Sequence, residues 1–277
     1  MNARQVAAAA CGFSVMLVIM PALLPALLPA QAIARRVAQV KDGTVRMSFA
    51  SRSDVCGNRA GSISTGNGAH RTMNSNGSVG NTTTRHNEWE DDCEAGPVRV
   101  AIDIADGRPI ALRAYVGGRW RAGADVTDLG TVPVKDAVDY LLDDLARREG
   151  KVAGEAIFPA TVADSMVVWP RLLKLAKDDS RSRSVRTQAV FWVSQAAGDK
   201  ATAGLIEVAG DAAADQDVRL QAVFALSQRP KDEGIPALLD IAKNSKDPKI
   251  RKQSIFWLGQ SGDPRAIAYF EAVLVKK

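Results

Sequence analysis

The chain has 277 residues, a formal net charge of +5 and two histidines. This small positive charge, without a motif that reads a nucleic-acid groove, argues against a nucleic-acid-binding protein. No Ser-His-Asp order, glycine-rich phosphate loop or cysteine nucleophile is recognisable, so we expect no enzyme and no cofactor, with only a carboxylate-based activity left open.

Residues 1–32 have the pattern of a secretory signal peptide. Arg4 precedes an almost uncharged apolar run that ends in Ala-Gln-Ala at residues 30–32. This arrangement predicts cleavage after Ala32 and export to the periplasm or the cell exterior. The alternative is an uncleaved membrane anchor, because the run approaches the length of a bilayer span, although its three prolines disfavour a continuous helix.

Cleavage at that site removes Arg4 and Cys11, which leaves a net charge of +4 and two cysteines, Cys56 and Cys93. An even pair in an exported chain predicts a disulfide, whereas a reducing compartment would leave two free thiols.

Residues 33–43 form a polar leader that we expect to be poorly ordered. Beyond it, residues 44–50, 98–104 and 110–116 alternate between apolar and polar side chains, which is typical of half-buried strands. Asp106-Gly107 joins the last two runs and favours a hairpin turn. We therefore expect a small β domain over residues 44–132 that leans on the first helices of the following domain.

Residues 57–87 contain almost no large apolar side chain, which predicts a long mobile loop tethered by the two cysteines. His70 and His86 lie in this loop, but neither has a partner at metal-ligand spacing, so we expect no metal site. The acidic run at residues 88–94 is interpreted as a solvated turn, with weak Ca²⁺ binding as the alternative.

From residue 133 to the C-terminus the pattern is helical and repetitive. Residues 134–148 predict an opening helix with Val138, Leu141, Leu142 and Leu145 on one face. Residues 185–195 return as residues 218–228 and 250–260, at spacings of 33 and 32, and residues 152–158 begin a degenerate first copy. Two helix-length segments per copy predict an α-solenoid.

The recurring Val-Arg-x-x-Ala-Val-x-x-Leu pattern resembles HEAT-like repeats of the phycobilisome-lyase type over about residues 150–277. The fold class is therefore α+β, with a C-terminal solenoid of HEAT-like helical pairs over residues 133–277 behind a small disulfide-linked β domain. The resemblance also implies structural arginines near the start of each first helix, paired with residues at the end of the preceding helix: Arg186, Arg219 and Arg251 with Asp178, Asp211 and Asn244.

Two kinds of enzyme share such repeats. Deoxyhypusine hydroxylase holds two irons with His-Glu pairs, and this chain has no histidine after His86. Bilin lyases act on light-harvesting proteins, and nothing beyond the repeat itself points to a tetrapyrrole. The resemblance therefore carries no catalytic residue over to this chain.

A helical wheel places Phe191 nearly opposite the buried face of its helix, between Gln188 and Gln195. The same triplet recurs in the next two copies, which predicts a stripe of aromatic rings flanked by amides: Phe224 with Gln221 and Gln228, and Phe256 with Gln253 and Gln260. One hypothesis makes this stripe a partner groove or homodimer seam. The other packs the rings against the neighbouring repeat.

We therefore predict a non-catalytic scaffold of the cell envelope that binds another envelope protein or peptide, with a homodimer as one form of it. Membrane contact is expected only through an uncleaved signal segment. The alternative is binding of a small ligand or glycan by the β domain and its 57–87 loop, with Trp89 and Trp120 as stacking platforms.

Overall fold

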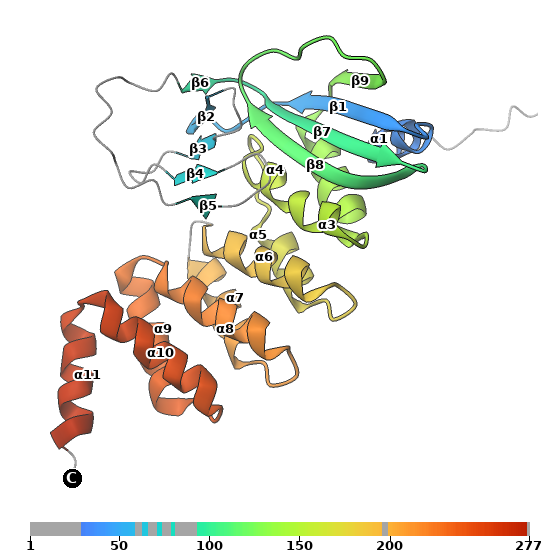
Figure 1. Ribbon diagram of the computed structural model, residues 1–277. Helices are drawn as coiled ribbons and strands as arrows, with labels where there is room; N and C mark the ends of the chain where they lie inside the picture. The colour runs from blue at the N-terminus through green and yellow to red at the C-terminus, as the bar shows by residue number, and fades with distance from the viewer. Residues whose placement is uncertain are drawn as a thin grey trace, which may run out of the picture.

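The computed structural model describes residues 29–58, 63–65, 71–73, 79–80, 93–195 and 199–275. Two β-sheets lie at one end of a stack of helices, and α11 (Pro264–Val275) lies at the other end (Figure 1). This arrangement confirms the predicted fold class. Residues 1–28, most of the predicted signal peptide, lie outside the described residues. In the part that is described, every helix is too short or too polar to span a bilayer.

The larger sheet has the strand order β8-β7-β1-β9. Its members are β1 (Gly43–Phe49), β7 (Val98–Ala105), β8 (Arg108–Val116) and β9 (Val126–Thr131). β1, β7 and β8 are antiparallel neighbours and match the three predicted strands, whereas β9 pairs in parallel with β1 and was not predicted. Asp106 and Gly107 both have positive φ, 50° and 70°, as a two-residue type I′ hairpin requires.

The smaller sheet corrects the prediction for residues 57–87. Its strands, in the order β5-β4-β3-β2-β6, are β5 (Val79–Gly80), β4 (Arg71–Met73), β3 (Ile63–Thr65), β2 (Val55–Gly57) and β6 (Glu94–Ala95). The expectation of a mobile loop is therefore wrong for the described part, where the Ile63 side chain is fully buried. Backbone pairing links these short strands, and the confirmed Cys56–Cys93 disulfide, with Cα atoms 5.2 Å apart, joins β2 to the residue before β6. His70 and His86 lie outside the described residues.

The predicted leader at residues 33–43 also differs from the structure. Helix α1 (Pro29–Ala38) buries Ile33 and Val37 against α2 (Val134–Asp139) and the π-helical turn η1 (Tyr140–Asp144). These two apolar residues lie one helical turn apart, so a short helix that also carries two arginines presents one apolar edge to the core.

Helical elements fill the rest of the chain. η2 (Leu145–Arg147) continues α2 and η1, so the predicted helix at residues 134–148 is present with Val138, Leu141, Leu142 and Leu145 buried. Four helical pairs follow. Pair 1 is α3 (Lys151–Glu155) and α4 (Ile157–Thr161) with α5 (Trp169–Lys177). Pair 2 is α6 (Arg183–Ser194) with α7 (Asp199–Gly210), pair 3 is α8 (Gln216–Ser227) with α9 (Lys231–Asn244), and pair 4 is α10 (Pro248–Ser261) with α11.

One continuous core joins the larger sheet to the helices. At this joint, the buried carboxylate of Glu155 on α3 accepts a hydrogen bond from the backbone N–H of Leu112 in the edge strand β8, with a distance of 2.8 Å. Its other oxygen lies 2.9 Å from the Lys151 ammonium. Pair 1 therefore both covers the sheet and satisfies a donor at its edge, as the expected dependence of the β domain on the first helices requires.

We expect Glu155→Ala to lower the free energy of unfolding by about 1–3 kcal/mol, because it leaves the buried N–H of Leu112 without an acceptor. Glu155→Gln is the matched control, since its amide oxygen can still accept that hydrogen bond, and it should cost less. Urea titration followed by circular dichroism measures both variants. Equal losses in the two would show that the hydrogen bond to Leu112 is not what stabilises the joint.

Candidate functional site

The first helices of pairs 2 to 4 each begin at a polar cap. Ser182, Asp215 and Asp247 occupy the N-cap positions of α6, α8 and α10. The Asp247 carboxylate accepts hydrogen bonds from the backbone N–H groups of Lys249 and Ile250, at 2.9 and 3.4 Å. Two of these caps, Asp215 and Asp247, therefore place carboxylates one repeat apart in the stack.

Two buried arginines bridge successive repeats through these caps. Arg186 on α6 donates to Asp215, the cap of α8, and to Asp179 at 2.7 Å. Arg219 on α8 donates to Asp247, the cap of α10, at 2.8 Å, and to the Ala209 carbonyl at 3.2 Å. Each guanidinium therefore fixes the position of the following first helix, and the carboxylates offset its desolvation.

The carboxylate partners differ from those that the resemblance implied. Asp178 accepts from Ser180, Asp211 accepts from the Ala213 N–H, and Asn244 donates to Asp240. These residues stabilise their own turns. The aspartate that pairs with each arginine lies 28 or 29 residues farther along the chain. The ion pair therefore joins two successive repeats and does not lie within one turn.

Electrostatics favour the ionised form of Asp247. Burial opposes its charge most strongly, but the N–H groups of Lys249 and Ile250 and the Arg219 guanidinium together hold the pKa of this carboxyl below its ordinary value.

A third buried arginine, Arg229, was not predicted. It donates to the Ser194 carbonyl, to Thr202 and to Glu233, and so joins pairs 2 and 3 at the opposite end of their first helices.

The predicted aromatic stripe is only partly exposed. Phe158 of pair 1 stacks on Trp192 of pair 2, and Phe224 of pair 3 lies 5.0 Å from the Trp257 ring of pair 4. Between them, Phe191 is half-buried and faces a repeat that has Ala225 in place of a tryptophan. Phe256 is exposed. Phe158 and Phe224 therefore pack against the next repeat, Phe191 is half-buried, and of these rings only Phe256 is exposed.

The predicted glutamines fall into two groups. Gln195, Gln228 and Gln260 are exposed at the ends of the first helices, in a row that we call the amide edge. Gln221 and Gln253 are half-buried, whereas Gln188 is exposed although its amide lies against pair 1, where a Cβ on Gly154 would come within 3.0 Å of the amide nitrogen. The structure thus separates the amide edge, at the ends of the first helices, from the glutamines inside these helices.

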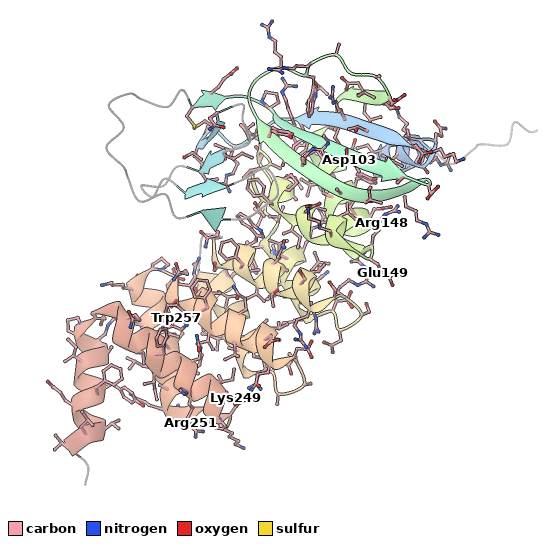
Figure 2. The ribbon with its side chains drawn as sticks, in the orientation of Figure 1. Asp103, Arg148, Glu149, Lys249, Arg251 and Trp257 are labelled. Atoms are coloured by element: carbon pink, nitrogen blue, oxygen red, sulfur yellow. A yellow bond between two sulfur atoms is a disulfide. The ribbon has the colours of Figure 1, made fainter. Side chains whose placement is uncertain are left out.

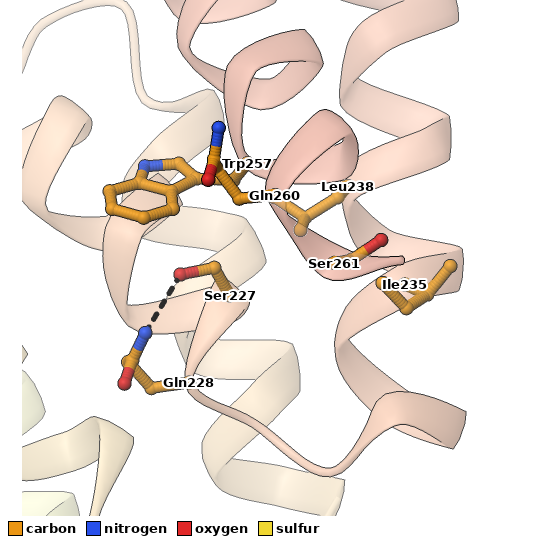
Figure 3. A pocket seen from close by; sticks show the side chains of 7 residues that line it. All are labelled: Ser227, Gln228, Ile235, Leu238, Trp257, Gln260 and Ser261. Atoms are coloured by element: carbon orange, nitrogen blue, oxygen red, sulfur yellow. Dashed lines mark hydrogen bonds between the residues drawn. The ribbon is translucent and has the colours of Figure 1, made fainter. Parts of the chain in front are cut away.

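A pocket of about 150 Å³ opens on the amide edge between pairs 3 and 4 (Figure 3). Gln228, Gln260 and the Trp257 indole supply polar groups, and Ile235 and Leu238 of α9 supply apolar walls; Ser227 and Ser261 complete the lining. Trp257 Nε1 is buried and has no hydrogen-bond partner in the described part of the chain. The sequence analysis did not predict this pocket.

The alternative glycan site has less support. Trp120 carries the Arg46 guanidinium 4.7 Å from its ring centre, so an arginine already stacks on this platform. Trp89 lies outside the described residues. Among those described, no cluster of three histidine, cysteine or acidic residues could hold a metal ion.

The HEAT-repeat family model matches residues 202–277, from α7 through pair 4. This segment is therefore similar to HEAT repeats, as the recurring pattern indicated. The copies before residue 202 are assigned from their spacing and from the helices themselves. No curated protein matches the chain. HEAT repeats generally form protein-interaction scaffolds, whose extended surfaces contact partners.

Arg219 and Arg251 provide a matched pair of variants, because only Arg219 has a carboxylate partner among the described residues. We expect Arg219→Ala to lower the free energy of unfolding by about 2–3 kcal/mol, since it removes charge-assisted hydrogen bonds between two repeats. Arg251→Ala, which loses a bond to the Ser245 carbonyl, should cost about 1 kcal/mol or less. Urea denaturation measures both. A loss at Arg251 as large as that at Arg219 would contradict the bridging role.

Proposed function

We propose that this protein is a non-catalytic interaction scaffold of the cell envelope that binds a segment of another protein along the amide edge. The pocket between pairs 3 and 4 is the observation that carries this proposal. Its volume of about 150 Å³ is too small for most organic ligands or cofactors, which occupy roughly 300–1,000 Å³. It exceeds several times the roughly 30 Å³ share of one water molecule.

The size and chemistry of the pocket fit one side chain of a partner. The exposed amides of Gln228 and Gln260 can bind a polar end group, while Ile235, Leu238 and Trp257 form the apolar part of the lining. Gln260 and Gln228 belong to neighbouring repeats, so a bound segment would cross the seam between them. Such a mode uses a surface that the repeats create together, as solenoids commonly do.

Export is part of the same proposal and is supported by the residue pattern at the N-terminus and by the disulfide. Disulfides persist mainly in oxidising compartments such as the periplasm or the cell exterior.

We expect a photo-crosslinking amino acid at Gln260 to form an adduct with one defined protein in the native cell. The same residue at Lys174, exposed on α5, is the control and should form none. Gln228→Ala should reduce the Gln260 adduct about 3- to 10-fold, because the loss of one hydrogen bond weakens binding by about 1 kcal/mol. Adducts are measured by mass spectrometry. Equal adducts at both positions, or none at Gln260, would contradict the proposal.

Export is tested by the N-terminus of the protein recovered from the envelope fraction. We expect it to begin at Ile33, so that α1 keeps the two side chains it buries, Ile33 and Val37. Terminal sequencing and the intact mass identify this end. An intact Met1 would show that the segment is retained as an anchor.

A further inference from the structure

Pair 4 leaves an apolar face uncovered at the end of the stack farthest from the sheets (Figure 1). α11 buries only Ala266 among its described apolar side chains. Large apolar residues of α10 and α11 are exposed instead: Ile255, Phe256, Ile267, Val273, Leu274 and Val275. A solenoid needs polar terminal elements to stay soluble, so an uncovered face of this kind marks a contact surface.

The equivalent positions of earlier repeats show what normally covers this face. Val190 on α6 and Val223 on α8 occupy the same repeat position as Ile255, and both are 0% exposed because the next first helix packs over them. Ile255 is 39% exposed. Likewise, Phe256 is 51% exposed, whereas Phe224 contacts the tryptophan of the following repeat. The face therefore has the composition of a repeat interface without the helix that completes it.

Within the part of the chain that the structure describes, the arginine of pair 4 lacks the ion pair that its counterparts in pairs 2 and 3 form. Arg186 and Arg219 each hold the aspartate that caps the next first helix. Arg251, at the N-terminal end of α10 (Figure 2), donates to the Ser245 carbonyl at 2.6 Å, and no carboxylate of the described residues forms an ion pair with it. In the two earlier repeats, the corresponding partner is an aspartate at the start of the next first helix.

Charge distinguishes between the possible occupants. Residues 246–277 contain seven Lys or Arg residues and three Asp or Glu residues, a net charge of +4. Asp247 and Asp263 are already held by Arg219 and Arg265. If two copies of the chain bound each other through this end of the stack, their positive charges would repel. An acidic partner would instead be attracted.

We propose that the face formed by α10 and α11 docks an acidic helical pair of another protein, which stacks as a further repeat. An aspartate at the N-terminus of its first helix pairs with Arg251, and its apolar side covers Ile255 and Phe256. This inference rests on the proposed function, because it names a second contact and the chemistry of the partner.

A crosslinking amino acid at Ile267, on the exposed side of α11, tests the docking in the native cell. The expected adduct is a net-acidic segment with helical periodicity, and its yield should fall at least fivefold in Arg251→Ala. Lys252→Glu reverses an exposed charge on α10, one helical turn from Phe256, so it should lower the yield without affecting the fold. An adduct with a second copy, with lipid or with a basic segment, or no adduct, would overturn the proposal.

The Gln260 crosslink separates this inference from the proposed function. An adduct at Gln260 without one at Ile267 rejects only the docking of a helical pair. Absence of both rejects the scaffold function as well.

A defined probe tests the interface in the purified full-length protein. Residues 211–245 of this chain form pair 3, carry a net charge of −2 and already cover pair 2 through Asp215. When this segment is appended after residue 277, it should stack on pair 4. Arg251→Ala should then shift the unfolding equilibrium of the extended protein about tenfold more than that of the protein without the extension. The same shift in both proteins would overturn the pairing of Arg251 with an incoming aspartate.

Discussion

The stacking of the repeats depends on a guanidinium that reaches across a repeat boundary. Arg186 and Arg219 are buried, so each must hold a carboxylate, and the carboxylate each one finds caps the next first helix. Pair 1 supports this interpretation, because Ala153 stands at the arginine position and the following cap is Ser182. At the three boundaries between pairs, the arginine and the aspartate are thus present together or absent together. This ion pair fixes how far one repeat is shifted relative to the next, and so determines how the aromatic rings and the amide edge align.

The two ends of the stack are completed differently. At the first end, the larger sheet takes the place of a preceding repeat, with Glu155 satisfying a backbone N–H of its edge strand. At the other end, α10 and α11 retain the apolar surface that every earlier repeat buries. Between these ends, the pocket at Trp257 lies where two complete repeats meet. The proposed binding surfaces therefore arise from how neighbouring repeats join, rather than from any single helix.

Much of the fold was predictable because its signals are local. The spacing of 33 and 32 residues located the helical pairs, and alternation located β1, β7 and β8. β9 was missed, because Val126–Thr131 has no clear alternation and its parallel partner lies far away in sequence. The site was harder to predict because it also depends on residues far apart in sequence. A helical wheel ranks Phe191, Phe224 and Phe256 alike, whereas their exposure depends on what the next repeat places opposite them.

The disulfide also shortens the loop that must close when the larger sheet forms. The central strands β1 and β7 are separated by the 48 residues numbered 50–97. With Cys56 joined to Cys93, the shortest path between them runs through seven residues, 50–56, and five residues, 93–97. A fourfold shorter loop lowers the entropic cost of closure by about 1 kcal/mol. Oxidation before folding therefore speeds the encounter of these strands, and the redox state of the compartment influences the folding rate as well as the stability.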